Sequence, residues 1–210
     1  MVTAQIYSAI YGGYDLVRDR PGVTLFTEAD EPLTELPLNR LRAKWWKVIP
    51  HIACPAADVT VWIDGNMDVR IPDLAERCVA ELGDDDMLFI RHPWRDDIYE
   101  EAVESLKMSK YRGMPLLEQV RSYRRSGHPK HWGLVHGGLL VRRNTPAVVD
   151  FDRTWWHEIV RWSVQDQLSL PPLLRRSDLR WHWWPVSPLD DVPGDAGWVS
   201  RHAGAHARPD

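Results

Sequence analysis

The chain has 210 residues, of which 44% are hydrophobic and 27% charged, with two cysteines and twelve tryptophans. This composition excludes a disordered chain and predicts one globular domain, while a net charge of −4 argues against tight non-specific binding of nucleic acid. Cys54 and Cys78 lie far apart without a CxxC spacing, so neither a zinc site nor a disulfide framework is indicated. Because the chain shows no signal peptide and no stretch as long as a membrane span, we expect a cytoplasmic protein.

Strands and helices alternate along the chain. In chain order, the hydrophobic patterns predict a strand over 2–10, a strand over 23–27, a helix over 39–49, a strand over 59–63, a helix over 72–82, a strand over 87–90, helices over 97–111 and 115–126, a strand over 134–141 with an interruption at 136–138, helices over 147–162 and 165–174, and a strand over 181–184. This order predicts a single-domain α/β fold over residues 1–185, with a mixed, mostly parallel sheet flanked by helices. Residues 186–210 are expected to be a loop or tail, either mobile or folded over the site.

Asp64-Gly65-Asn66 directly follows the almost wholly apolar run 59–63. In an open α/β sheet, ligands bind beyond the carboxyl ends of the strands. Asp64 and Asn66 offer oxygen ligands to Mg²⁺ or Mn²⁺, Gly65 permits a tight turn, and His202 in the tail offers a nitrogen ligand. An ordinary Asp-Gly turn is an equally good interpretation of these residues alone.

A second candidate segment, Tyr11-Gly12-Gly13-Tyr14-Asp15, follows the first predicted strand. Its glycines allow a ligand to approach the backbone, its tyrosine rings suit stacking on a nucleobase or ribose, and Asp15 suits a hydrogen bond to either group. A surface turn is the alternative. The segment is not a G-x-G-x-x-G motif, which disfavours a dinucleotide site.

Basic residues follow in the helix predicted over 39–49. Lys44 and Lys47 are three positions apart and share a face opposite the core stripe, where they and Arg42 would neutralise a diphosphate. A plain solvated helix face is the alternative interpretation.

Two later segments carry further candidates. His92 and Arg95 follow the strand over 87–90 and should lie at the same rim of the sheet as Asp64. Asp166 and Gln167 begin the helix over 165–174, where Asp166 is either a general base that orients an acceptor hydroxyl or a helix N-cap.

These segments, in this order, resemble a glycosyltransferase-like family that was first classed as a domain of unknown function. The family includes plant turgor-regulation-defect and mucilage-related proteins and bacterial homologues. The matching segments are Ala9-Ile10-Tyr11-Gly12-Gly13-Tyr14-Asp15, Phe26-Thr27, Arg42-Ala43-Lys44 with Lys47, Pro50-His51, Trp62-Ile63-Asp64-Gly65-Asn66, His92-Pro93 with Arg95, Tyr99-Glu100-Glu101-Ala102, Trp155-Trp156 with Glu158, and Asp166-Gln167-Leu168-Ser169. The chain departs from the family pattern at Asn66, which carries no charge, and at Glu28, where we expect Asp.

The resemblance implies a GT-A fold and transfer of a sugar from a UDP- or GDP-sugar to a hydroxyl acceptor, assisted by Mn²⁺ or Mg²⁺. It implies catalytic residues Asp166, Gln167, His92 and Arg95, and metal ligands Asp64, Asn66 and, by position, His202. The donor-binding residues would be Tyr11, Gly12, Gly13, Tyr14, Asp15, Thr27, Arg42, Lys44, Lys47, Asp64, Gly65 and Asn66. The acceptor-binding residues would be Trp94, Trp132, Trp156, His136 and Gly137.

Several alternatives stay open at this stage. The acceptor of the transfer is a glycan, a small molecule or a hydroxymethylated DNA base, and the acidic charge argues mildly against DNA. A ceramidase-like hydrolase is a second reading, although the sequence has neither a G-x-S-x-G nor an H-E-x-x-H motif. A non-catalytic, Trp-rich module that binds carbohydrate or nucleotide is a third. For the donor, Asn66 implies either a weakly held ion or a diphosphate held mainly by Lys44 and its neighbours.

Overall fold

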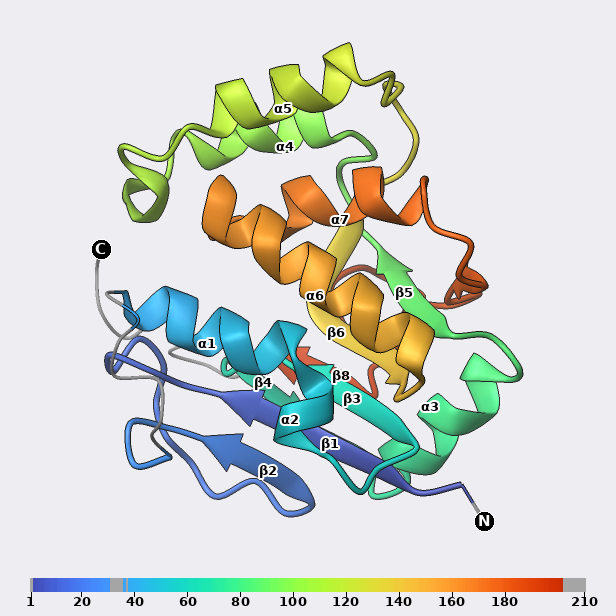
Figure 1. Cartoon of the computed structure of the whole chain (residues 1–210). Coiled ribbons are helices and arrows are strands. Elements are labelled where there is room, and N and C mark those ends of the chain that lie inside the picture. The colour runs from blue at the N-terminus through green and yellow to red at the C-terminus, as the bar shows by residue number, and fades with distance from the viewer. Residues whose placement is uncertain (1, 31–35, 37, 202–210) are drawn as a thin grey trace.

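A six-stranded sheet forms the centre of the computed structural model, which describes residues 2–30, 36 and 38–201 (Figure 1). The strand order is β2-β1-β3-β6-β5-β7, with β1 at Ala4–Ala9, β2 at Val23–Phe26, β3 at Val59–Ile63, β5 at Met87–Arg91, β6 at Val135–Arg143 and β7 at Trp181–Trp183. Strand β1 is parallel to β2 and β3, and β5 is parallel to β7, whereas β6 is antiparallel to both β3 and β5. The predicted α/β fold with a mixed, mostly parallel sheet is confirmed.

Helices cover both faces of this sheet. The helices are α1 at Asn39–Val48, α2 at Pro50–Ala53, α3 at Leu74–Leu82, α4 at Ile98–Ser105, α5 at Leu116–Arg125, α6 at Pro146–Arg161 and α7 at Asp166–Leu174, with a 3₁₀ turn, η2, at Ser109–Tyr111. Helices α1 and α6 share one core cluster with one face of the sheet, and α3 shares another with the opposite face. Helices α4, α5 and α7 form a third cluster beside the sheet, at the top of Figure 1.

Strand β3 shows how the sequence builds these layers. All five of its residues are buried: Val61 and Ile63 pack on the α3 side, and Trp62 packs on the α1 and α6 side. Successive side chains of a strand point to opposite faces, so a strand with both faces covered reads as a continuous apolar run. The strand then delivers the polar Asp64 to the edge of the sheet.

Some boundaries differ from the expectation. Helix α1 ends before Pro50 as expected, but Pro50 also begins α2, because proline is well tolerated in the first turn of a helix. The helix expected over 97–111 is divided into α4 and η2. The interruption expected at 136–138 is wrong, because β6 is continuous and absorbs the irregularity as a shift in its pairing with β5.

The segment after Pro185 contains a strand that we did not expect. Strand β8 (Val199–Arg201) pairs with β4 (Met67–Val69), which directly follows the turn at residues 64–66. The division of the chain at residue 185 stays a prediction. Residues 202–210, including the proposed ligand His202, lie outside the described residues. Within the described part of the chain, every helix is too short or too polar to cross a membrane.

Candidate functional site

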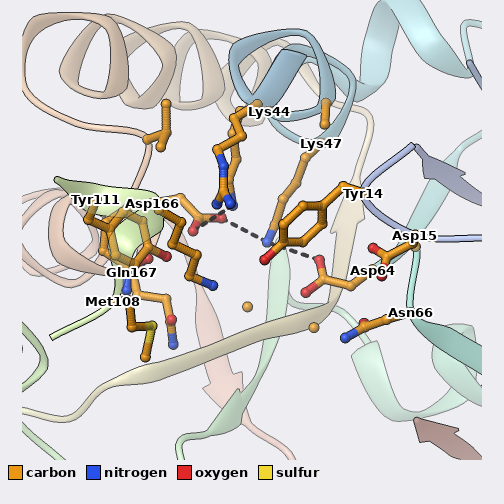
Figure 2. Close-up of a pocket in the computed structure, with 18 of the residues that line it drawn as sticks. Tyr14, Asp15, Lys44, Lys47, Asp64, Asn66, Met108, Tyr111, Asp166 and Gln167 are labelled. Atoms are coloured by element: carbon orange, nitrogen blue, oxygen red, sulfur yellow. Dashed lines mark hydrogen bonds and ion pairs between the residues drawn. The ribbon is translucent and has the colours of Figure 1, made fainter. Parts of the chain in front are cut away.

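A cavity of about 780 Å³ lies where β1 and β3 end, and residues of α1, β6, η2 and the start of α7 complete its wall. Its position follows from the fold, because neighbouring parallel strands present their carboxyl ends at one edge of the sheet. Figure 2 shows Tyr14, Asp15 and Asn66 on one side of the cavity and Asp166 and the η2 region on the other. The side chains of Lys44 and Lys47 enter between these two sides from α1.

Two lysines and two aspartates form the centre of the cavity, and we call Lys44, Lys47, Asp64 and Asp166 the lysine–aspartate cluster. The Nζ atom of Lys44 lies 2.8 Å from Oδ1 of Asp166, and Nζ of Lys47 lies 2.7 Å from Oδ2 of the same residue. Lys47 Nζ also lies 3.4 Å from Oδ1 of Asp64, and that oxygen accepts a hydrogen bond of 2.8 Å from Trp62 Nε1. Lys47 thus links the two carboxylates.

Local structure explains how these residues meet. Lys44 and Lys47 are nearly one turn apart on α1, so they reach into the same space. Trp62 and Asp64 are two positions apart at the end of an extended strand, which places both side chains on one side. Asp166 is the first residue of α7, where the helix dipole favours a negative charge, and Gln165 is the N-cap. The solvated helix face is therefore the wrong interpretation for Lys47, whose side chain is 2% exposed.

The charges of the cluster perturb one another. Burial by itself raises the pKa of Asp166, but Lys44 and Lys47 outweigh burial and hold that pKa far below its usual range. The same balance of burial against the two lysines lowers the pKa of Asp64. A carboxylate held between two ammonium groups is a weak base, so the geometry does not favour the predicted role of Asp166 as general base.

The two lysines respond differently to this environment. Burial lowers the pKa of Lys44 to about 8, although Asp166 acts in the opposite direction. Burial also acts to lower the pKa of Lys47, but Asp166 and Asp64 outweigh it and the pKa rises. Lys47 therefore stays charged at neutral pH, while Lys44 titrates just above it.

Most of the predicted site residues line this cavity. They are Tyr11, Tyr14, Asp15, Lys44, Lys47, Asp64, Gly65, Asn66, His92, Trp94, Arg95, His136, Gly137, Asp166 and Gln167. Those outside its lining are Gly12, Gly13, Thr27, Arg42, Trp132 and Trp156. The predicted site residues therefore divide into fifteen that line this cavity and six described ones that lie outside its lining.

The donor residues outside the lining are held by neighbouring groups. The backbone N–H of Thr27 donates to Oδ2 of Asp30 over 2.7 Å, which closes a turn away from the cavity. The N–H of Gly12 donates to Glu28 over 2.5 Å, and Nε of Arg42 donates to a backbone oxygen over 3.2 Å. Thr27, Gly12 and Arg42 thus lie outside the cavity lining, and their donor role stays a prediction.

Two predicted acceptor tryptophans, Trp132 and Trp156, are partly buried and contact other tryptophans. The rings of Trp156 and Trp45 meet edge-on with 5.2 Å between their centroids, and Trp132 lies 5.5 Å from Trp181. Both residues pack against the main core cluster. Trp94, by contrast, is 63% exposed and lines the cavity, and its role at the acceptor stays a prediction.

Two further predictions change with the geometry. Tyr11 is 4% exposed, and its hydroxyl accepts a hydrogen bond of 2.8 Å from Trp46 Nε1. The Tyr11 ring is therefore packed in the core, where little of it is accessible for stacking on a nucleobase. Nδ1 of His92 lies 3.2 Å from the backbone N–H of Arg95, which fixes the loop after β5. Burial and the nearby Arg95 lower the pKa of His92 to about 3, so the ring is neutral at physiological pH, and its catalytic role stays a prediction.

The sequence reasoning missed several residues of the cavity. Arg40 lies over the ring of Tyr14, with 4.6 Å from its guanidinium carbon to the ring centroid, and Tyr111 of η2 forms part of the far wall. Arg201 of β8 also lines the cavity. Arg40 lies on the same basic face of the helix as Lys44 and Lys47, so its position could have been predicted. The sequence after Pro185 showed no pattern that indicated a role for Arg201.

A buried ion pair supports α1 beneath the cluster. Nη1 of Arg142 on β6 lies 3.0 Å from Oδ1 of Asp152 on α6, and its Nη2 donates to the hydroxyl of Tyr7 and to the carbonyl of Lys47. The Tyr7 hydroxyl donates to the same carbonyl over 3.1 Å. Burial raises the pKa of Asp152 to about 7 against the effect of Arg142. This network fixes the end of α1 from which the Lys47 side chain extends.

The described residues offer few ligands to a divalent metal ion, and the metal role of Asp64, Asn66 and His202 stays a prediction. Oδ1 of Asp64 already accepts from Trp62 and faces the Lys47 ammonium, and Asn66 contributes an amide in place of a second carboxylate. Across residues 2–30, 36 and 38–201, no group of three or more His, Cys, Asp or Glu side chains is placed to hold a metal ion. Mg²⁺ is usually held by one or two carboxylates together with waters and substrate phosphates, and here Asp64 would be the single carboxylate of the Asp64-Gly65-Asn66 turn.

Comparisons with known proteins agree with this geometry. Residues 32–183 match the family model of the TOD1/MUCI70, glycosyltransferase-like domain. The Arabidopsis thaliana protein named "Probable hexosyltransferase MUCI70" is 23% identical over 155 residues, which is 69% of this chain and 26% of that protein. The chain therefore spans about a quarter of the length of the curated relative it matches.

A solved structure shares the fold. The crystal structure of a glycosyltransferase involved in glycosylation of the major capsid of PBCV-1 superposes with a TM-score of 0.52 at 12% identity, covering 98% of this chain and 96% of that one. At this identity the likeness concerns the fold alone. Together these findings confirm the expected GT-A fold.

Proposed function

Since the chain belongs to the TOD1/MUCI70 glycosyltransferase-like family, we propose that it transfers a sugar from a UDP- or GDP-sugar to a hydroxyl acceptor. The observation that carries the proposal is the pair of buried lysines, Lys44 and Lys47, in a cavity at the carboxyl ends of two parallel strands. A sugar leaves its donor with a diphosphate on which negative charge develops, and fixed positive charges stabilise that group in the transition state.

The charge of the cavity supports an anionic ligand. Seven basic side chains line it, against four acidic ones, although the whole chain has a net charge of −4. The basic side chains are Arg40, Lys44, Lys47, Arg95, Lys107, Lys110 and Arg201, and the acidic ones are Asp15, Asp64, Glu101 and Asp166. Such a local excess raises the concentration of anions at the site.

The two sides of the cavity suit the two substrates. On one side, Tyr14 and Asp15 line the cavity with a ring and a carboxylate, groups that suit a nucleobase and a ribose, and Asp64 lies next to them (Figure 2). On the other side, Gln167 and Tyr111 lie near Asp166 (Figure 2). We place the donor on the first side and the acceptor on the second, with Trp94 at the acceptor entrance.

The proposal is tested with a panel of nucleotide sugars and the purified chain. We expect release of UDP or GDP from a donor, and Asp64→Ala should retain no more than about a tenth of the rate because Lys47 loses one of its two carboxylate partners. Asp150→Asn, which removes an exposed carboxylate on α6, is the matched control and should behave as wild type. If no nucleotide sugar binds or reacts across the panel, the proposed function is wrong.

Nucleoside diphosphate binding should weaken as the pH rises through about 8, the pKa to which burial lowers Lys44. Below this value the amine is a cation that attracts the diphosphate, and above it the amine is neutral. The dissociation constant for UDP is measured from about pH 6.5 to about pH 9.5, with Lys44→Arg as the comparison, because arginine stays charged throughout. An equally steep loss of affinity in both proteins would show that another group is responsible.

The alternatives receive less support from the site. A Trp-rich binding module would need tryptophans at its surface, whereas Trp132 and Trp156 are partly buried and pack against the main core cluster. A ceramidase-like hydrolase does not explain the excess of positive charge around a closely paired lysine–aspartate cluster. A hydroxymethylated DNA base is distinguished from a glycan acceptor by assaying transfer to modified DNA.

A further inference from the structure

We infer that the ammonium of Lys47, with Lys44 beside it, neutralises the donor diphosphate without a divalent metal ion. This inference rests on the proposed function and concerns how the same site holds its donor. Its basis is the disagreement between the metal site that the sequence pattern implies and the side chains that the structure brings together at Asp64.

The first observation is the place that the Lys47 ammonium occupies. It lies between the carboxylates of Asp64 and Asp166, at 3.4 Å and 2.7 Å. A divalent ion on Asp64 would lie within a few ångströms of this charge, and two cations at such a distance repel each other, although the Asp64 side chain is 39% exposed and solvent weakens the repulsion. The side chain is 2% exposed, so the ammonium cannot retreat into solvent.

The second observation concerns the oxygens that a metal would need. Oδ1 of Asp64 is engaged by both Trp62 Nε1 and Lys47 Nζ, which leaves one carboxylate oxygen for an ion. The next ligand in the pattern is the amide of Asn66, which brings no negative charge. Replacing a carboxylate by an amide weakens a hard-cation site but does not weaken a site in which a lysine carries the positive charge.

The third observation is the space beside the ammonium. Gly137 of β6 has no side chain, and a Cβ atom there would lie 3.0 Å from Lys47 Nζ and 3.7 Å from Asp166 Oδ2. An ammonium has three N–H donors, and the two carboxylates account for two of them. The glycine thus keeps room next to the remaining donor, on the cavity side where a phosphate oxygen would lie.

The test measures nucleotide binding by calorimetry with the metal-stripped chain, first in EDTA and then with Mn²⁺ or Mg²⁺. UDP and GDP are the probes, and uridine and guanosine show how much of the affinity depends on the diphosphate. We expect UDP or GDP to bind equally well in both conditions, within about twofold, because the positive charge belongs to the protein. Electron paramagnetic resonance of Mn²⁺ should show no more ion bound with protein and nucleotide than with nucleotide alone.

Lys44→Met is the second arm of the test, since Lys44 is partly exposed and its loss should spare the fold. The dissociation constant should rise about tenfold or more in EDTA, as for the loss of one charge-assisted contact, and Mn²⁺ should not restore it. Lys130→Met, an exposed lysine outside the cavity, is the matched control and should bind as wild type.

The outcomes separate the two levels of the proposal. If Mn²⁺ or Mg²⁺ tightens binding by more than about tenfold, or rescues Lys44→Met, the inference is overturned and the proposed function stands. If neither UDP nor GDP binds in any condition, the proposed donor class itself is contradicted, and the inference falls with it.

Discussion

Replacing Lys47 by methionine is expected to abolish sugar transfer and to weaken nucleoside diphosphate binding by about a hundredfold, the effect of truncating one partner of a buried charge pair. The variant removes the cation that links Asp64 to Asp166 and leaves two carboxylates facing the cavity with Lys44 alone. An incoming diphosphate would then meet like charges. Affinity is measured by titration of UDP and GDP, and transfer by release of nucleotide from the donor.

Two comparisons separate this effect from loss of the fold. Lys47→Arg keeps a positive charge at the same place and should retain measurable binding, although the larger planar group will not reproduce both contacts. Thermal unfolding of both variants reports whether the buried site still assembles. Binding of UDP or GDP by Lys47→Met with the affinity of the wild type would remove Lys47 from the donor site.

The layers of the fold were predictable because they depend on simple periodicities. The apolar run 59–63 became a central strand, and the alternating pattern at the start of the chain became β1. The pairing of β4 with β8 was not predictable, because each has three residues and their contact joins segments about 130 positions apart. Such short strands carry too little pattern to be distinguished from loop.

The candidate site was predictable at the level of the sheet edge rather than of individual contacts. From sequence, Asp64, His92 and Arg95 were placed at this edge because each follows a predicted strand, and all three line the cavity. That Lys47 is buried between two aspartates was not predictable, since an amphipathic pattern shows which face is polar but not what packs against it. The burial of Tyr11 likewise depends on Trp46, which lies 35 positions away.

The buried ion pair between Arg142 and Asp152 could be predicted only in part from the sequence. A charged residue next to the apolar run of β6 is compatible with the end of a strand, and the sequence alone does not name Asp152 as its partner. In the structure the side chains of Arg142 and Asp152 are 1% and 0% exposed. Because a buried charge without a counter-ion destabilises the fold, each of these two charges depends on the other.

Arg142→Met is therefore expected to lower the free energy of unfolding by about 3–5 kcal/mol, the range for removing one partner of a buried ion pair. Asp152 would be left buried without its counter-ion, and the Lys47 carbonyl would lose one of its two donors. Urea denaturation followed by circular dichroism measures the change. Arg153→Met, which breaks an exposed arginine–aspartate pair on the same helix, is the matched control and should change stability by no more than about 0.5 kcal/mol.

The double variant Arg142→Met with Asp152→Leu decides what the pair contributes. Removing both charges leaves no unpaired group in the core, so most of the stability lost in the single variant should return. In the double variant, the free energy of unfolding should recover more fully than the affinity for UDP. The apolar pair cannot donate to the Lys47 carbonyl, so α1 is held less firmly and UDP should still bind more weakly than to the wild type. Full recovery of UDP affinity in the double variant would show that the ion pair supports the core alone and does not position Lys47.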